Sequence, residues 1–150
     1  MRIVIQRVTS ASVAIDNEVV GKIGKGMLIL LGVSPEDSTQ DADWLVGKVS
    51  RLRIFDDENG VMNLSISDIG GEALVVSQFT LMASYRKGNR PSYIHAASPD
   101  LAVPLYKYFV ETLGKTLGQS IPTGRFGADM QVSLTNDGPV TIVMDSKNPE

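Results

Sequence analysis

The chain has 150 residues, of which 43% are hydrophobic and 21% are charged, and its formal net charge is −3. This length and composition are typical of one domain with one hydrophobic core, and they exclude a disordered chain. The sequence has no cysteine and a single histidine, His95, which excludes disulfides and a cysteine nucleophile and leaves a zinc site short of ligands, so neither a metal nor a cofactor is expected.

The N-terminal segment lacks the pattern of a signal peptide, because an arginine at position 7 follows only a short apolar run. The longest strongly apolar run, residues 27–33, is too short to cross a bilayer. We therefore expect a cytoplasmic protein without a membrane partner. The acidic balance argues against a broad basic face, so RNA would be held through a small local patch, and DNA is not an expected partner.

The first third of the chain has the pattern of β-strands. Strands are predicted over residues 2–9, 11–15, 18–23 and 27–31. Turn residues separate them at Asp16–Asn17 and at Gly24–Gly26. The last run is continuously apolar, which is typical of a strand buried on both faces. This succession predicts an antiparallel meander.

Two segments have the periodicity of helices. The first follows a capping-box pattern at residues 38–41, after which apolar residues recur from Trp44 to Leu52. The second begins at Ser98–Pro99, with serine as the cap and proline in the first turn, and Gly118 is expected to end it.

The remaining segments complete the predicted fold. Residues 73–76 form another buried strand, and residues 82–97 form a long loop. The chain closes with a predicted hairpin of strands 130–134 and 140–144, joined by a turn at residues 136–138. We expect a single α+β domain over residues 1–150, with a mainly antiparallel sheet or partly closed barrel and two helices packed on it.

The segment Ser77–Gln78–Phe79–Thr80 lies at the end of a buried strand, directly before the long loop, where functional groups often lie. Ordinary strand-forming residues would give the same pattern. A serine hydrolase would need a base beside a hydroxyl, and His95 is the only histidine. No Gly-x-Ser-x-Gly elbow surrounds any serine, which disfavours a conventional triad.

Two further patterns have both a structural and a functional interpretation. Gly138–Pro139 fits a turn that leads into a strand, and its isomer cannot be read from the sequence. Arg86, Lys87 and Arg90, between Tyr85 and Tyr93, form the one basic and aromatic cluster. Such a cluster suits phosphates and a stacked base, but it also suits a solvated loop.

The combination and order of these motifs resemble the D-aminoacyl-tRNA deacylase family, also called the D-tyrosyl-tRNA(Tyr) deacylases. The likeness extends from Met1 to Met144. Its two most diagnostic stretches are Ser-Gln-Phe-Thr-Leu at 77–81 and Asn-Asp-Gly-Pro-Val-Thr at 136–141. The other matching segments are residues 5–8, 30–33, 53–55, 62–64, 90–92, 97–100 and 123–130.

The resemblance implies a homodimer that hydrolyses the ester of D-aminoacyl-tRNA, with the active site at the subunit interface. One subunit would supply the catalytic segment, with the residues Ser77, Gln78, Phe79 and Thr80. The partner would supply Gly138–Pro139 as a cis peptide whose carbonyls obstruct L-residues. Arg7 would brace that segment, and Phe126 and Met130 would belong to the pocket. Glycyl-tRNA should be accepted in part, because glycine has no side chain to exclude.

The chemistry implied by the resemblance has two versions. In the first, backbone N–H groups around Phe79 and Thr80 stabilise the oxyanion, and water attacks with help from the ribose 2′-hydroxyl. In the second, Thr80 is a covalent nucleophile, although no base is close to it in the sequence. The rival interpretations are a non-catalytic protein that binds the tRNA acceptor end, a scaffold that dimerises through its Gly-Pro hairpin, and an esterase that uses Ser77 and His95.

Overall fold

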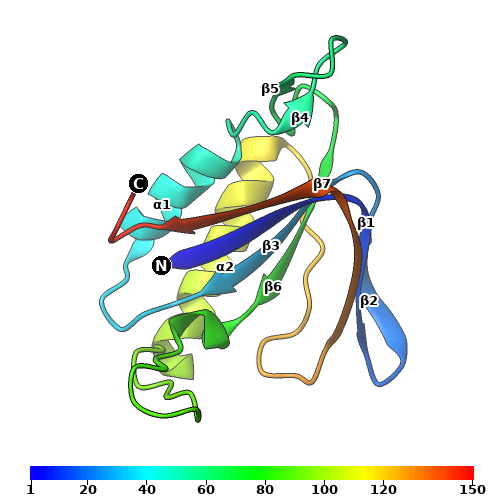
Figure 1. Ribbon diagram of the computed structural model, residues 1–150. Helices are drawn as coiled ribbons and strands as arrows, with labels where there is room; N and C mark the ends of the chain where they lie inside the picture. Colours follow the sequence, from blue (N-terminus) through cyan, green and yellow to red (C-terminus); the bar gives the residue numbers. More distant parts are fainter.

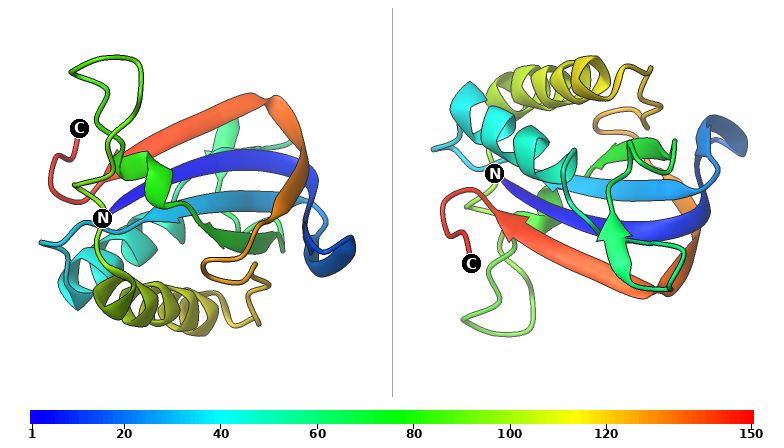
Figure 2. Two further views of the ribbon diagram at one scale, coloured as in Figure 1. Left: turned by 90° about the horizontal axis from the view of Figure 1, so that it is seen from below. Right: turned by 90° about the horizontal axis from the view of Figure 1, so that it is seen from above.

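The computed structural model describes all 150 residues. One curled sheet has the strand order β2-β1-β3-β6, and β7 pairs with the other side of β1 (Figures 1 and 2). Its strands are β1 (Arg2–Ile15), β2 (Glu18–Ile23), β3 (Gly26–Gly32), β6 (Glu72–Ser77) and β7 (Gln131–Asp145). The remaining elements are α1 (Thr39–Val49), β4 (Phe55–Asp56), β5 (Met62–Leu64), the 3-10 helix η1 (Phe79–Met82) and α2 (Pro99–Leu117).

The two helices cover one face of the sheet, which curls into a half-barrel (Figure 2). The larger core fills the space between the helices and the sheet, and its fully buried side chains include Ile5, Ile29, Leu45 and Phe109. A smaller cluster with Val13, Leu28 and Leu74 lies on the other face. Buried side chains of β3 therefore occur on both faces, as its continuous apolar run predicts. The predicted partly closed barrel with two helices is confirmed.

Both helices begin where the sequence places their caps. Ser38 and Asp41 form the predicted capping box, with the Ser38 N–H donating to the Asp41 carboxylate at 2.8 Å. Pro99 lies in the first turn of α2, and Gly118 ends that helix with a left-handed φ of 67°. Glycine adopts this conformation without a Cβ penalty. No helix in the structure is both long enough and apolar enough to span a membrane.

The strand pairing differs from the predicted meander. The first half of β1 pairs with β3 and its second half pairs with β2, both antiparallel, so β2 and β3 are not neighbours. β3 and β6 run parallel. A parallel pair needs a long crossover, which α1 and the β4–β5 hairpin supply here.

The predicted C-terminal hairpin is wrong, because β7 is a single long strand that follows β1 along almost its whole length. Between the pairs Gln6–Thr141 and Val8–Asn136, five steps of β7 face only two steps of β1. The additional residues bulge out of the sheet instead of reversing the chain. The Asn136 side chain closes this bulge by accepting from the Val140 N–H at 2.8 Å.

Candidate active site

The segment Ser77–Thr80 leaves the sheet at the end of β6. The Gln78 N–H donates to the Leu31 carbonyl at 2.7 Å, which fixes the point where the chain turns into η1. Gly32 lies so close to η1 that a Cβ there would be 3.0 Å from the Gln78 carbonyl oxygen and 3.1 Å from Leu81 Cβ. The end of β3 therefore needs a glycine for η1 to pack against it.

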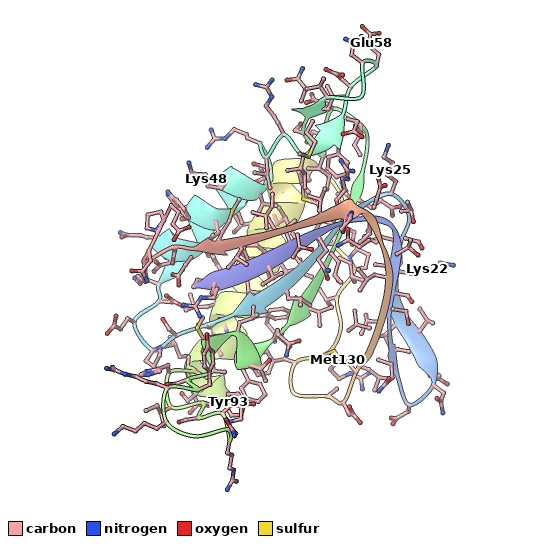
Figure 3. The ribbon with its side chains drawn as sticks, viewed as in Figure 1. Lys22, Lys25, Lys48, Glu58, Tyr93 and Met130 are labelled. Carbon is pink, nitrogen blue, oxygen red and sulfur yellow. The ribbon has the colours of Figure 1, made fainter.

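A cavity of about 250 Å³ opens beside this segment. Its wall consists of Val76, Ser77, Gln78, Phe79, Phe126, Gly127, Ala128, Met130 and Val132. The structure thus brings five of the expected site residues to one place, namely Ser77, Gln78, Phe79 with its exposed ring, Phe126 and Met130. Thr80 does not line this cavity. Met130 lies on the segment that leads into β7 (Figure 3).

The far wall of the cavity is held against β6. The Val75 N–H donates to the Pro122 carbonyl at 3.1 Å, and the Tyr106 hydroxyl donates to the Val75 carbonyl at 3.1 Å. The Tyr106 ring meets the Phe126 ring edge-on, with centroids 5.9 Å apart. Burial raises the pKa of Tyr106 to about 12, so this hydroxyl keeps its proton at neutral pH. The pattern of the sequence did not indicate a role for Tyr106.

The polar groups of the segment have few partners. The Gln78 side-chain amide donates to the Thr80 hydroxyl. Neither Ser77 nor Thr80 has a hydrogen bond to a histidine or a carboxylate, and His95 lines a different cleft. No group of three or more His, Asp or Glu side chains is placed to hold a metal ion.

The second diagnostic segment lies in the bulge of β7. The Gly138–Pro139 peptide bond is cis, and both residues are exposed. The buried Arg7 donates from Nε to the Asp137 carbonyl at 2.8 Å, and from a terminal nitrogen to the Ile54 carbonyl at 2.8 Å. Arg7 therefore contacts the segment that the family resemblance associates with it. Neither Gly138 nor Pro139 lines the cavity at Ser77 within this chain.

The basic and aromatic loop follows η1. The Tyr93 ring, labelled in Figure 3, meets the Phe79 ring edge-on, with centroids 5.0 Å apart. Arg86, Lys87 and Arg90 are all exposed and form no ion pair. Arg86 lines a cleft at the other end of η1 from the cavity, and Lys87 and Arg90 line neither the cleft nor the cavity.

Comparisons with known proteins agree with these motifs. The family model described as D-Tyr-tRNA(Tyr) deacylase matches residues 4–145. Relatives named D-aminoacyl-tRNA deacylase from Bacteroides thetaiotaomicron and Flavobacterium psychrophilum are 61% and 59% identical, each over 100% of both chains.

Two solved structures share the fold. The c-Myc DNA Unwinding Element Binding Protein is 43% identical, with a TM-score of 0.91 over 97% of this chain and 98% of its own. A probable eukaryotic D-amino acid tRNA deacylase is 17% identical, and its TM-score of 0.81 over 95% of this chain and 97% of its own shows the same fold. Sequence, motifs and architecture together lead to one conclusion: this chain belongs to the D-Tyr-tRNA(Tyr) deacylase family.

Proposed function

We propose that this protein hydrolyses the ester bond of D-aminoacyl-tRNA in the cytoplasm, which releases tRNA and the free D-amino acid as a proofreading step in translation. The observation that carries the proposal is the cavity at the end of β6, where Ser77, Gln78 and Phe79 meet Phe126 and Met130. The full-length relatives named D-aminoacyl-tRNA deacylase support the same activity.

The proposed working unit is a homodimer. Gly138 and Pro139 are exposed and lie outside the cavity of their own chain, so a second copy is needed to bring them to it. β7 pairs only with β1, which leaves its other edge free over 15 residues. Long free edges are normally covered in stable proteins, and Leu134 and Val143 add exposed apolar surface to this strand.

The proposed chiral filter consists of backbone atoms. A side-chain pocket separates amino acids by only modest amounts per methylene group. The carbonyls of Gly138 and Pro139 would instead act on the substituents at Cα, so they exclude L-residues and leave a D-side chain outside the pocket. Broad tolerance of D-residues follows from this arrangement. Partial hydrolysis of glycyl-tRNA follows as well, because glycine has no side chain to exclude.

The proposed chemistry uses water rather than an enzyme nucleophile. The backbone N–H groups of Phe79 and Thr80 would stabilise the developing oxyanion. The Thr80 hydroxyl accepts a hydrogen bond from Gln78 and has no base beside it, so it has no group to take its proton. The ribose 2′-hydroxyl next to the ester would assist the attacking water. Ser77 and Gln78 would position the substrate.

The test is deacylation of matched D-tyrosyl-tRNA and L-tyrosyl-tRNA by the purified, chelator-treated protein. Rapid loss of the D-ester alone supports a metal-independent chiral proofreader. Equal loss of both esters would overturn the filter at Gly138–Pro139. If neither ester is lost while tRNA still binds, the protein is the non-catalytic binder of the acceptor end.

A further inference from the structure

A second and larger depression lies at the other end of η1 from the cavity. It has a volume of about 510 Å³ and runs between η1, the loop after it and the C-terminal tail. We call this depression the basic cleft, after Arg2, Arg86 and Lys147 in its wall. Met82, at the end of η1, lines the basic cleft, whereas Phe79, at the start of η1, lines the cavity. Phe79 and Met82 are about 6 Å apart along the axis of this short helix, so the two sites are neighbours. The basic cleft is lined by Arg2, Ser34, Met82, Ala83, Ser84, Tyr85, Arg86, His95, Asp145, Lys147 and Asn148.

The charge of this cleft differs from that of the whole protein. Arg2, Arg86 and Lys147 line it, and Asp145 is the only carboxylate among the lining residues. Both oxygens of that carboxylate are engaged, because Oδ2 accepts from Arg2 at 2.8 and 3.0 Å and Oδ1 accepts from the Lys147 N–H at 2.9 Å. Because Arg2 is paired with Asp145 and Lys147 with Asp41, the positive charge left for a ligand is that of Arg86, in a chain with a net charge of −3.

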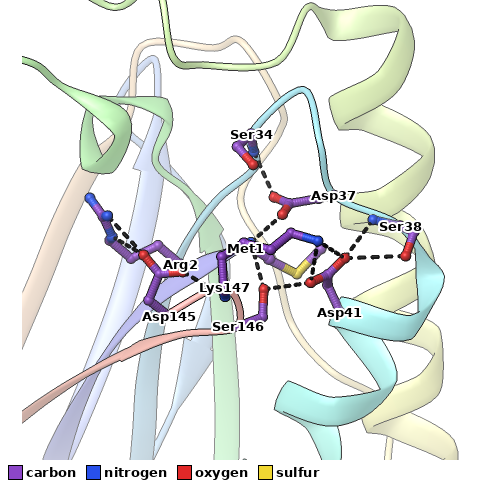
Figure 4. Close-up of polar contacts among 9 residues, drawn as sticks. All are labelled: Met1, Arg2, Ser34, Asp37, Ser38, Asp41, Asp145, Ser146 and Lys147. Carbon is purple, nitrogen blue, oxygen red and sulfur yellow. Dashed lines mark hydrogen bonds and ion pairs between the residues drawn. The ribbon is translucent and has the colours of Figure 1, made fainter. Parts of the chain in front are cut away.

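Two of the three cations are held in place by the fold (Figure 4). The Arg2 guanidinium also donates to the Leu81 carbonyl of η1 at 2.7 Å. Lys147 Nζ donates to the Asp41 carboxylate at 3.0 Å. Arg86 is exposed and has no ion pair, so it is the cation whose charge is free for a ligand. Arginine suits phosphate because its planar fork can donate two hydrogen bonds at once.

We propose that this basic cleft binds a phosphodiester group of the tRNA acceptor end, with Arg86 as the principal contact and with Arg2, His95 and Lys147 around it. The inference rests on the proposed function, because the ester-bearing nucleotide would occupy the cavity at the start of η1 while the adjoining backbone crosses to the end of the same helix. The proposal assigns this role to Arg86 alone among the three cations of the loop, since Lys87 and Arg90 do not line the cleft.

The first experiment compares two esters, D-tyrosyl-tRNA and the D-tyrosyl ester of adenosine, which has no phosphate. For Arg86→Ala, the ratio of kcat/KM for the tRNA ester to that for the adenosine ester should fall about fivefold to tenfold, and further for Arg86→Glu. The slope of log KM against log salt should decrease by about 0.7. The matched control is Lys22→Ala, because Lys22, labelled in Figure 3, is an exposed cation on β2 that does not line the basic cleft.

An unchanged ratio and salt slope in both Arg86 variants would overturn the proposal, and so would an equal loss in Lys22→Ala. A second measurement keeps the basic cleft testable apart from catalysis. Uncharged tRNA should bind Arg86→Glu about fivefold to tenfold more weakly than the unaltered protein. If the unaltered protein hydrolyses neither ester, the proposed function fails, while this binding result still decides whether the cleft holds RNA.

Discussion

Arg7, on β1, donates its Nε hydrogen bond to the carbonyl oxygen of Asp137, at 2.8 Å, and so connects the centre of the sheet to the bulge in β7. The same guanidinium also donates to the Ile54 carbonyl and to the Asp56 carboxylate, although only 6% of the residue is exposed. The buried Arg7 side chain therefore connects the bulge in β7 to residues 54–56, at the beginning of the β4–β5 hairpin.

Replacing this arginine should cost both stability and selectivity. In Arg7→Ala, the carbonyls of Ile54 and Asp137 lose their donor, and we expect the free energy of unfolding to fall by about 3 kcal/mol. We also expect the ratio of D-ester to L-ester hydrolysis to fall, because the bulge loses its support. Urea unfolding and paired deacylation assays measure the two effects. The control Arg53→Ala removes an exposed donor to the Asn63 carbonyl and should cost less than about 1 kcal/mol.

Gly138 allows a direct test of the proposed filter. Its φ is +138°, and a Cβ would be 2.9 Å from Val140 Cγ2 and 3.1 Å from a terminal nitrogen of Arg7. Gly138→Ala should therefore displace the backbone of the bulge, slow hydrolysis of the D-ester and narrow the preference over the L-ester. Gly60→Ala is the control, because Gly60 also has a positive φ, of +74°, but has open space around its Cβ position. Loss of selectivity in both variants would show that the effect is not specific to the filter.

The role of Thr80 can be decided by pairing a protein change with a substrate change. We expect Thr80→Ala to keep its kcat within about tenfold of the unaltered protein, whereas loss of a true nucleophile costs on the order of 10⁴ to 10⁶. A substrate that ends in 2′-deoxyadenosine should not react if the ribose hydroxyl assists. Single-turnover deacylation measures both. A trapped acyl-enzyme in the unaltered protein would contradict the water mechanism.

The network in Figure 4 predicts how stability depends on pH. Burial acts to raise the pKa of Asp41, but hydrogen bonds from Ser146, Ser38 and Lys147 outweigh it and hold that pKa well below its usual 3.8. A carboxyl with a depressed pKa in the folded state stabilises the protein above its unfolded value, and this stabilisation is lost as the pH falls. We expect the melting temperature to decrease from about pH 5 to about pH 3, and to decrease less in Asp41→Asn.

The matched control for this pH dependence is Glu58→Gln, because Glu58 is an exposed carboxylate at the tip of the β4–β5 hairpin (Figure 3). The melting temperature of Glu58→Gln should depend on pH in the same way as that of the unaltered protein. A curve for Asp41→Asn that is as steep as that of the control would show that other carboxylates account for the acid sensitivity.

Local chemistry was enough to predict the helices. The capping box at Ser38 and Asp41 and the stop at Gly118 depend on residues within one or two turns, so the sequence defines them. The C-terminal hairpin was wrong for the opposite reason. Residues 136–138 have the composition of a turn, but pairing with β1, about 130 residues away, keeps both halves of β7 in one strand.

The candidate site shows the same limit. The family resemblance brought Ser77, Phe126 and Met130 together before the structure did, whereas spacing alone gave no reason to place residues about 50 apart in one cavity. No pattern joined Arg2 to Lys147, because only the pairing of the first and last strands makes them neighbours.

That pairing also determines when the protein can fold. β1 and β7 are matched from Arg2–Asp145 to Ala14–Gln131, so β1 must wait for a partner that the ribosome makes more than 100 residues later. Contacts between such distant segments form slowly. Until β7 is made, Ile3, Ile5 and Val8, which are fully buried in the folded sheet, have no partner strand on that side. The nascent chain is therefore prone to aggregation until residues 131–145 are available, and a truncation within them should leave it dependent on chaperones.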